Sequence, residues 1–367
     1  MRKSLWFLFV FILCIFKLEA QTDFFKGKTI RIADVAWGAT AAEVVTNLKT
    51  LSGSERQVFL EAGAKKEGTF VLYSTMAQDH GNEVLAGFRR RYPFISTQLQ
   101  RAGTTALLSR ILGEARAGKH EVDVSNQPPE TIIEMTRAGL IERYQSPNRV
   151  AVRREMMDEN GVWTGAYHLV IVVAYNARMV SKEELPKKYE ELADSRWKGR
   201  LHLDPDDVDW FDSLLAYWGE KKTLAFMRQL AALQPDLRIG KTLSAQLLGA
   251  GEFGIAPYLN GYRIAEMKAQ GAPVDFLLMA PVFSKPRVVF LAKHAPHPHA
   301  AILFLDWILS EEAQTLIGQK LGRDPVRKGM KSKYEELDYP NYIVTRESLG
   351  PIYKKQLQQY HEVIGYK

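Results

Sequence analysis

The chain has 367 residues, of which 46% are hydrophobic and 25% are charged. A chain of this length is too long to fold around a single hydrophobic core, so two domains are expected. Its formal net charge of +7 is spread along the sequence, and the densest basic cluster, RRRYP at 89–93, is typical of a solvated helix end rather than of a nucleic-acid surface. The only cysteine is Cys14, which excludes an internal disulfide as a source of stability.

The first twenty residues have the pattern of an export signal. Arg2 and Lys3 precede an apolar run at 5–16 that is too short to span a bilayer, and the small residue Ala20 suits cleavage. We therefore expect a signal peptide over residues 1–20, cleaved near Ala20, and a periplasmic mature protein; the alternative is an uncleaved N-terminal anchor. Cleavage would remove three basic residues, one acidic residue and Cys14, so the formal net charge would fall from +7 to +5 and no thiolate metal site could form.

Strand and helix patterns alternate through the first half of the mature chain. Residues 21–64 form a lead-in that carries a strand pattern at 29–35, and SERQ at 54–57 matches a capping box at a helix start. Beyond it, the expected strands are 69–74, 94–100 and 122–124, and the expected helices are 58–66, 82–91 and one that starts at Thr104. Because no hairpin signal separates them, this alternation predicts a largely parallel sheet with helices on both faces.

The second half continues the alternation. LVIVVAY at 169–175 is the most apolar strand pattern, and Ser181 with Glu184 matches a second capping box. Further strands are expected at 274–278 and 288–291, and further helices at 209–218 with a continuation to 233, at 242–248 and at 300–309. No linker longer than a few residues separates the two halves, which indicates that the chain crosses between its domains more than once.

The stretch WKGRLHLDPDDVDWF at 197–211 combines a strand, an acidic turn and a helix start. Leu201 and Leu203 alternate with polar neighbours, and Pro205 lies in the turn. Open α/β sheets bind ligands where a strand ends in a loop that leads into a helix. The stretch is therefore a candidate ligand site, and the alternative is a surface helix capped by its aspartates.

Sequence signatures of catalysis are absent: the chain has no Gly-x-Ser-x-Gly elbow, no His-Glu-x-x-His pair and no Gly-x-x-x-x-Gly-Lys-Ser/Thr phosphate loop. We therefore expect no enzyme activity and no cofactor. Asp206 and Asp209 leave a secreted hydrolase as an alternative, with one carboxyl group as acid and the other as base. His294, His297 and His299 could bind a metal, but the interleaved prolines favour an extended loop with solvated histidines, so no metal site is expected.

Polar and aromatic residues recur where the expected strands end. Because the carboxyl ends of the strands gather at one edge of a doubly wound sheet, these loops are expected to form a binding cleft. The candidate ligand-binding residues are Ser74, Thr75, Gln78, Thr104, Thr105, Asp206, Asp207, Asp209, Trp210, Lys241, Thr242, Tyr258, Asn260 and Tyr262. For Trp210, Tyr258 and Tyr262 the alternative is a place in the hydrophobic core.

Six segments occur in an order and spacing that match a known family. They are AKKEGTFVLYS, FRRRYP, LPKKYEELADSRWKGRLHLDP, GAGEFGIAPYLNGYR, HAPHPHAAILFLDWILSEEAQ and GRDPVR, between about Ala64 and Met330. Together they resemble the periplasmic solute-binding proteins of ABC importers, in the group that includes the ferric-iron-binding proteins and their relatives for phosphonates, thiamine, polyamines and sugar phosphates.

This resemblance implies an α/β fold of the type II periplasmic binding protein, with two Rossmann-like lobes joined by crossing hinge strands. It implies lobe one at 65–167 plus 286–367, lobe two at 168–285, and residues 21–64 as an N-terminal lead-in. The crossings would be the LVIVVAY and RVVFLA strands. A small-molecule solute would bind between the lobes and pass to an inner-membrane ABC permease, and the protein would be a monomer that binds no nucleic acid.

One departure separates this chain from the iron-binding members of that family. Those members carry adjacent tyrosines just before a Tyr-Arg pair, where this chain has Leu259 and Asn260, and they carry a ligand histidine where this chain has Ala77. Fe(III) prefers several hard anionic oxygens. We therefore predict capture of a small polar solute for import, and a ferric-iron or metal-chelate binding protein of the same family is the alternative.

The two lobes are predicted to face the cleft with opposite charges. The helix start at Thr104 and Thr105 offers free N–H groups and hydroxyls to an anion. The aspartates at 206–209 would attract an amine, with Trp210 or Tyr258 able to cover the face of a cation. The expected ligand carries both signs, as an aminoalkyl phosphonate does, or is an anion that chelates a metal.

Overall fold

The computed structural model describes residues 38–338, 342–345 and 350–367. The expected signal peptide and the strand pattern at 29–35 lie outside these residues. Within the described ranges, no helix combines the length and the apolar character that crossing a membrane requires.

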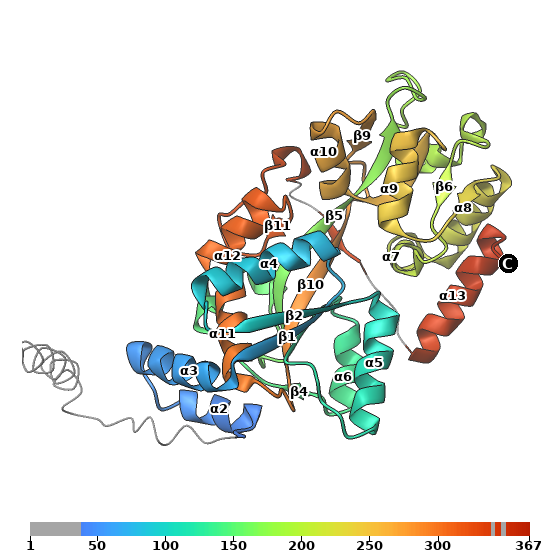
Figure 1. The fold of residues 1–367 in the computed structure, drawn as a ribbon. Coiled ribbons are helices and arrows are strands. Elements are labelled where there is room, and N and C mark those ends of the chain that lie inside the picture. Colours follow the sequence, from blue (N-terminus) through green and yellow to red (C-terminus); the bar gives the residue numbers. More distant parts are fainter. Residues whose placement is uncertain (1–37, 339–341, 346–349) are drawn as a thin grey trace, which may run out of the picture.

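The first lobe contains a parallel sheet with helices on both faces (Figure 1). β1 pairs in parallel with β2 on one side and with β3 on the other, which confirms the expected parallel arrangement for this part. Phe70 of β1 stacks on Phe304 of α11 with ring centroids 4.6 Å apart, so the sheet and the helix share one core. The elements are α2 (Ala41–Leu48), α3 (Gly53–Glu67), β1 (Thr69–Ser74), α4 (Gln78–Arg91), β2 (Ser96–Arg101), α5 (Thr104–Arg116), β3 (Val124–Gln127), α6 (Thr131–Arg137), β4 (Ile141–Glu142), α11 (Pro298–Ile308), α12 (Glu311–Thr315) and β11 (Asp324–Pro325).

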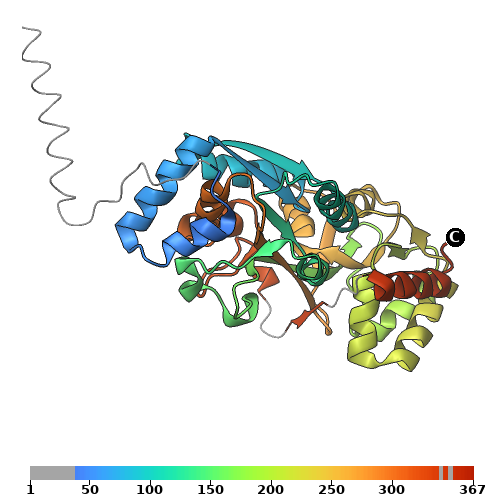
Figure 2. The same cartoon turned by 90° about the horizontal axis from the view of Figure 1, so that it is seen from below.

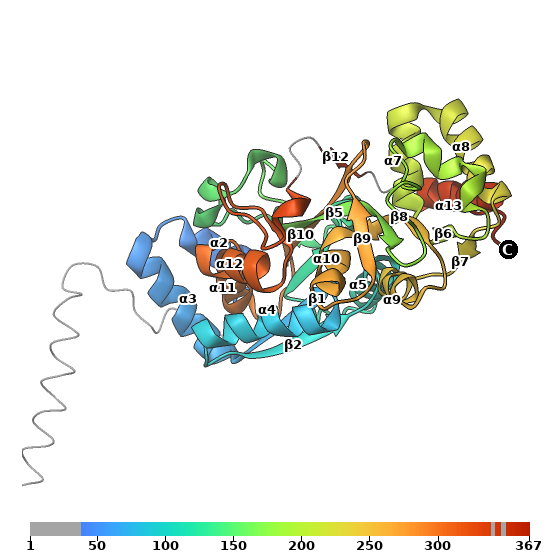
Figure 3. The ribbon, with the colours of Figure 1, turned by 90° about the horizontal axis from the view of Figure 1, so that it is seen from above.

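Two long strands, β5 (Thr164–Asn176) and β10 (Phe283–Ala292), join the lobes (Figure 3). β5 pairs with β10 over its first half and with β8 and β9 of the second lobe over its second half. Every residue of β5 is buried, because the strand lies inside a sheet over its whole length. All these pairings are antiparallel, since the chain leaves the first lobe along β5 and returns along β10. The expectation of a largely parallel sheet is therefore wrong for the crossing strands and for β8 and β9.

The second lobe has a hydrophobic cluster of its own, although Leu248, Leu259 and Ile264 of this lobe belong to the larger cluster that continues into the first lobe. Trp197, Trp210 and Phe211 are fully buried at its centre. Its elements are β6 (His202–Leu203), α7 (Val208–Trp218), α8 (Glu220–Ala232), β7 (Asp236–Leu237), α9 (Lys241–Ala250), β8 (Ile255–Asn260), α10 (Gly261–Ala269) and β9 (Val274–Leu277). The predicted strand, acidic turn and helix at 197–211 are confirmed as β6, the turn and the first residues of α7.

The helix α13 (Gly350–Ile364) follows the short strand β12 (Ile343–Val344) and packs on α7 and α8 (Figure 2). The sequence-based division assigned 286–367 to lobe one, whereas this helix lies against the second lobe. β12 itself pairs with the start of β10. The remaining boundaries between the lobes stay a prediction.

The two expected capping boxes have different outcomes. The box of α3 is formed by Ser52 and Glu55, two residues before the predicted one, and the Glu55 carboxylate accepts from the Ser52 N–H at 3.2 Å. Ser181 and Glu184 make the same backbone-to-carboxylate hydrogen bond at 2.8 Å, but in a turn. Pro186 follows closely and disfavours the continuation into a helix.

Candidate functional site

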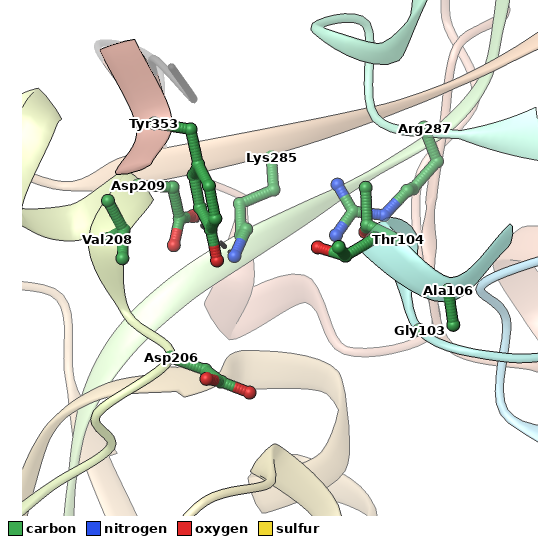
Figure 4. Close-up of a pocket in the computed structure, with 10 residues that line it drawn as sticks. Gly103, Thr104, Ala106, Asp206, Val208, Asp209, Lys285, Arg287 and Tyr353 are labelled. Carbon is green, nitrogen blue, oxygen red and sulfur yellow. Dashed lines mark ion pairs between the residues drawn. The ribbon is translucent and has the colours of Figure 1, made fainter. Parts of the chain in front are cut away.

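A cavity of about 350 Å³ lies between the lobes, beside the crossing strand β10 (Figure 4). Four elements contribute to it: the start of α5, the start of α7, β10 and α13. The lining residues are Gly103, Thr104, Thr105, Ala106, Asp206, Val208, Asp209, Lys285, Arg287 and Tyr353. A concave site of this size with a few converging polar groups suits a small-molecule ligand.

The start of α5 presents backbone donors to the cavity. Gly103 is its N-cap residue, makes no side-chain cap hydrogen bond and is followed by no acidic residue in the first turn. The first N–H groups of a helix have no partner inside the helix, so those of Thr104, Thr105 and Ala106 can donate to a ligand. With the positive end of the helix dipole they favour an anion.

Lys285 and Arg287 occupy alternate positions of β10, so both side chains project from the same face of the strand into the cavity (Figure 4). The Arg287 guanidinium donates to the carbonyl oxygen of Pro286 at 3.0 Å. It lies beside Thr104 in Figure 4, and no carboxylate in the described part of the chain forms an ion pair with it. A guanidinium next to a helix start is a favourable place for a phosphate-like or carboxylate group.

The acidic start of α7 is neutralised by the protein itself. Asp209 forms an ion pair with Lys285 and accepts a hydrogen bond from the hydroxyl of Tyr258 at 2.7 Å. Asp207 occupies the N-cap position but makes no cap hydrogen bond, and its carboxylate pairs with Lys241. Both buried carboxylates therefore have internal partners, which argues against the expectation that they attract an amine of the ligand and against simple helix capping.

The protonation of Asp209 follows from these contacts. Burial raises the pKa of its carboxyl group, but Lys285, Lys241 and the Tyr258 hydroxyl together outweigh burial and hold the pKa below its usual value. Asp209 is therefore a fixed anion that matches the positive charge of Lys285.

Asp206 is the acidic residue whose side chain stays exposed at the cavity. Its N–H donates to Oδ1 of Asp204 at 2.9 Å, which holds the turn. Partial burial and the nearby Asp204 charge raise the pKa of Asp206. Figure 4 shows Asp206 well separated from Arg287, so the cavity has a cationic end and an acidic end.

Four of the predicted site residues line this cavity, namely Thr104, Thr105, Asp206 and Asp209. The other ten do not line it, and a ligand-binding role for them stays a prediction. They are Ser74, Thr75, Gln78, Asp207, Trp210, Lys241, Thr242, Tyr258, Asn260 and Tyr262.

Trp210 and Tyr258 are core residues, as the alternative interpretation held. Both are buried, and their rings stack with centroids 5.6 Å apart. The Trp210 indole N–H donates to the Tyr189 hydroxyl at 2.7 Å. Ser74 is also fully buried and donates its hydroxyl to Oδ1 of Asn126 at 3.1 Å, a contact that links the end of β1 to β3.

A second junction between the lobes lies at the start of α10. The buried Arg323 donates to Nδ1 of His80 at 3.1 Å and to the hydroxyl of Tyr262 at 3.2 Å. Arg263 of α10 lies 3.9 Å from the Asp79 carboxylate of α4. Burial and the charge of Arg323 lower the pKa of His80 to about 4, so its imidazole is neutral and accepts. The His80 imidazole and the Tyr262 hydroxyl are groups of a kind that can bind a metal, but here both accept hydrogen bonds from the Arg323 guanidinium.

The prediction of solvated histidines is wrong for two residues of the KHAPHPHA segment. His299 is buried with its Nδ1 2.6 Å from Oε1 of Glu67, and His297 has its Nδ1 2.9 Å from Oδ2 of Asp123. These contacts fasten the start of α11 to the first lobe. Within the described ranges, no three His, Cys, Asp or Glu side chains are grouped so that they could hold a metal ion.

Sequence reasoning missed three charged or aromatic side chains that line the cavity: Lys285, Arg287 and Tyr353. A signal existed for the first two, because they are basic residues at alternate positions of an expected crossing strand, and one face of such a strand borders the cleft. No local signal marks Tyr353, since its place depends on how α13 packs on the second lobe.

Comparisons with known proteins agree with this architecture. Residues 130–342, more than half of the chain, match the family model described as bacterial extracellular solute-binding protein. The chain is 26% identical over 308 residues to iron uptake protein A1 of Synechocystis sp. The aligned region covers 76% of this chain and 82% of that protein.

Two solved structures show the same fold at low sequence identity. Iron-bound HitA from Pseudomonas aeruginosa matches with a TM-score of 0.67 at 22% identity, over 81% of this chain and 97% of that one. AfuA from Actinobacillus pleuropneumoniae, solved with fructose-6-phosphate bound, matches with a TM-score of 0.68 at 19% identity, over 82% of this chain and 99% of that one. The predicted fold of two α/β lobes joined by crossing strands is confirmed.

Proposed function

This chain belongs to the bacterial extracellular solute-binding proteins, and from that premise we propose that it captures a small anionic solute between its lobes and delivers it to an inner-membrane ABC permease. The observation that carries this proposal is the uncapped start of α5 beside the Arg287 guanidinium. The proposal includes export to the periplasm, action as a monomer and no catalysed reaction.

An anionic group with several oxygens, such as a phosphate or a phosphonate, suits the cationic end of the cavity. The N–H groups of α5 and the planar guanidinium of Arg287 on the crossing strand β10 provide directed donors, and such charge-assisted hydrogen bonds are the strong ones. At the other end, Asp206 can accept from a hydroxyl or an ammonium group. We therefore still propose a ligand that carries both an anionic group and a hydrogen-bond donor group, but we now assign the contact with the donor group to Asp206 instead of Asp209.

Ferric iron is the second candidate, because the Synechocystis relative is named an iron uptake protein and the HitA structure is iron-bound. Bare Fe(III) prefers several hard anionic oxygens. In this chain the Tyr262 hydroxyl and the His80 imidazole accept from Arg323, and the Asp209 carboxylate pairs with Lys285. An Fe(III) chelate of an organic acid, which presents carboxylates to Arg287, is compatible with the same cavity.

A hydrolase that uses Asp206 and Asp209 has weaker support. Such a pair needs one carboxylate that is free to act on a water or a sugar carbon. The Asp209 carboxylate is held by Lys285 and by the Tyr258 hydroxyl, which reduces its basicity and its access to a substrate.

Calorimetry and thermal unfolding with defined probes test the proposal. We would titrate the protein with inorganic phosphate, fructose 6-phosphate, citrate and ferric citrate, and compare it with Arg287→Gln. The matched control is Arg238→Gln, which removes a surface arginine that is paired with Asp236. A phosphate probe at a hundred times its Kd should add about 2.7 kcal/mol to the stability of the parent, and Arg287→Gln should weaken its affinity by about 1.5–3 kcal/mol.

The iron candidate gives a different pattern in the same experiment. Stabilisation by ferric citrate but by neither citrate nor the phosphates, unaltered in Arg287→Gln, would contradict the anion proposal and support iron. No binding of any probe would contradict both.

We further propose that the lobes close over the solute by bending of β5 and β10, with α13 moving together with the second lobe. A solute that touches both lobes binds the closed form better than the open form and therefore shifts the population toward it. Small-angle scattering should show a smaller radius of gyration at saturation with a probe whose binding is confirmed by calorimetry. An unchanged radius under those conditions would contradict closure.

A further inference from the structure

Two residues near the end of α13 set its position on the second lobe. Tyr360 is fully buried, its ring stacks on Phe211 with centroids 5.5 Å apart, and its hydroxyl donates to the carbonyl oxygen of Asp204 at 3.2 Å. In the next residue, His361, Nε2 lies 3.0 Å from the carbonyl oxygen of Pro205. Both contacts are made with the acidic turn before α7. The helix is therefore anchored directly to an element of the candidate site.

Tyr353 lies two helical turns before Tyr360, so both side chains project from the same face of α13. Because an α-helix rises about 1.5 Å per residue, Tyr353 lies about 10.5 Å from Tyr360 along the helix axis, toward the N-terminus of α13 and next to the start of α7. There it is half-buried and lines the cavity together with Asp209 and Lys285. In Figure 4 its ring extends into the cavity beside these two side chains. The anchor at Tyr360 thus determines where the Tyr353 ring lies in the cleft.

The ring is on the far side of the cavity from the anion donors. Figure 4 shows Arg287 and Thr104 on one side and Tyr353 with Val208 on the other. An anionic group held by Arg287 and α5 leaves the rest of an organic solute directed toward Tyr353. A tyrosine offers a flat apolar face to such a group, with a polar hydroxyl at its tip.

Resting on the function proposed above, we propose that Tyr353 is a specificity-determining residue: its ring packs against the organic part of the bound anion, so α13 completes the binding site. Organic anions then bind more tightly than an inorganic anion with the same head group. The match to the family model covers residues 130–342 and does not include α13.

The residues of α13 that are buried deepest against the second lobe are not Tyr353. Tyr360 and Ile364 are almost completely buried in the core of the second lobe and hold α13 there. Tyr353 packs against the same cluster as a partly buried residue and also lines the cavity. A role in selectivity and a role in anchoring therefore make different predictions for different ligands.

The test compares three probes that share a phosphoryl group: inorganic phosphate, phenyl phosphate and fructose 6-phosphate. Their affinities for the full protein, Tyr353→Ala and Tyr353→Phe are measured by calorimetry. In the parent, at least one organic phosphate should bind about tenfold more tightly than inorganic phosphate, a factor that corresponds to 1.4 kcal/mol. Tyr353→Ala should bring this ratio close to one without weakening inorganic phosphate, and Tyr353→Phe should keep the ratio because the ring is retained.

Tyr217→Ala is the matched control, since Tyr217 is a tyrosine of α7 with 52% of its surface exposed and no part in the cavity. It should leave all three affinities unchanged. A parent-like ratio in Tyr353→Ala overturns the inference while the proposed function stands. An equal loss for all three probes with a lower Tm shows that Tyr353 only anchors the helix, and also overturns it. If no probe binds the parent, the proposed function fails and the inference fails with it.

Discussion

Two helix starts face the same cavity, and they have opposite chemistry. The start of α5 has a glycine at the N-cap, no acidic residue in its first turn and no side-chain cap. The start of α7 has Asp207 at the N-cap and Asp209 in its first turn, and these acids pair with Lys241 and Lys285. Both helices have a positive dipole at this end, but only α5 leaves that dipole without a counter-charge from the chain.

The difference shows what makes a helix start available to a ligand. At α7 the two carboxylates place negative charge near the positive end of the helix dipole, and they link α7 to β10 and α9 through buried ion pairs. At α5 the chain provides a cation, Arg287, instead of an anion. We expect the first arrangement to contribute to stability and the second to contribute to binding, and three experiments follow in order of decreasing expected effect.

The largest effect is expected from Lys285→Met, which removes the partner of the buried Asp209 carboxylate. An unpaired charge in the protein interior is strongly unfavourable, so the free energy of unfolding should fall by about 3–5 kcal/mol. Urea unfolding followed by circular dichroism measures this loss. The control Lys268→Met breaks the surface pair with Asp275, which is 2.7 Å long, and should cost no more than about 1 kcal/mol. Equal losses in the two variants would show that the Asp209–Lys285 pair is no more important than a surface pair.

An intermediate effect is expected from Thr105→Asp, which gives α5 the acidic first turn that α7 has. The new carboxylate should repel a bound anion and weaken inorganic phosphate by about tenfold, or 1.4 kcal/mol. It should also stabilise the folded protein slightly, by about 0.3–1 kcal/mol, because it complements the helix dipole. Calorimetry measures the change in affinity and thermal unfolding measures the change in stability. The control is Thr105→Ser, which changes the same side chain but keeps its hydroxyl and adds no charge. An affinity for phosphate that survives this change would place the anion elsewhere.

The smallest effect concerns the junction at α10, where His80 accepts from Arg323. The pKa of His80 is about 4 in the folded protein, below its usual 6.5, so the unfolded chain binds a proton there at a higher pH than the folded protein does. This contribution to stability is complete above pH 6.5 and is lost as the pH falls toward 4. His80→Gln cannot titrate, so the stability advantage of the parent over this variant should shrink between pH 7 and pH 4.5. Because His80 keeps some contact with solvent, screening limits the change to about 1 kcal/mol, or a shift in Tm of about 1–2 °C for a chain of this length. An advantage that stays constant with pH would contradict the assigned protonation state.

Local sequence patterns were sufficient for many of the elements and for part of the site chemistry, but they predicted none of the helices α2, α10 and α13. The alternation of Leu201 and Leu203 and the turn residues after them predicted β6 and the start of α7 correctly, because strand, turn and helix signals act over a few residues. The start of α5 was predicted as an anion site for the same reason, since a helix N-terminus without acidic residues is visible in the sequence.

The remainder depends on contacts between distant residues. Asp209 was predicted to face a ligand, but its partner is Lys285 on the returning strand, and no local pattern connects the two. His299 was expected in a solvated loop, whereas it meets Glu67, 232 positions earlier in the chain. A buried polar group forms its hydrogen bonds with whichever partner the tertiary fold brings near. The sequence of a single segment does not identify that partner, because the partner belongs to a distant part of the chain.

The hydrogen bond from Tyr360 to Asp204 joins positions 156 residues apart, and it has a consequence for the order of folding. The core of the second lobe is closed by a helix that the chain supplies only after it has returned along β10 and completed the first lobe. Loop-closure entropy rises with the length of the intervening chain, and folding slows as contacts become more distant in sequence. The second lobe therefore lacks part of its core until α13, which follows the first lobe in the chain, has docked on it.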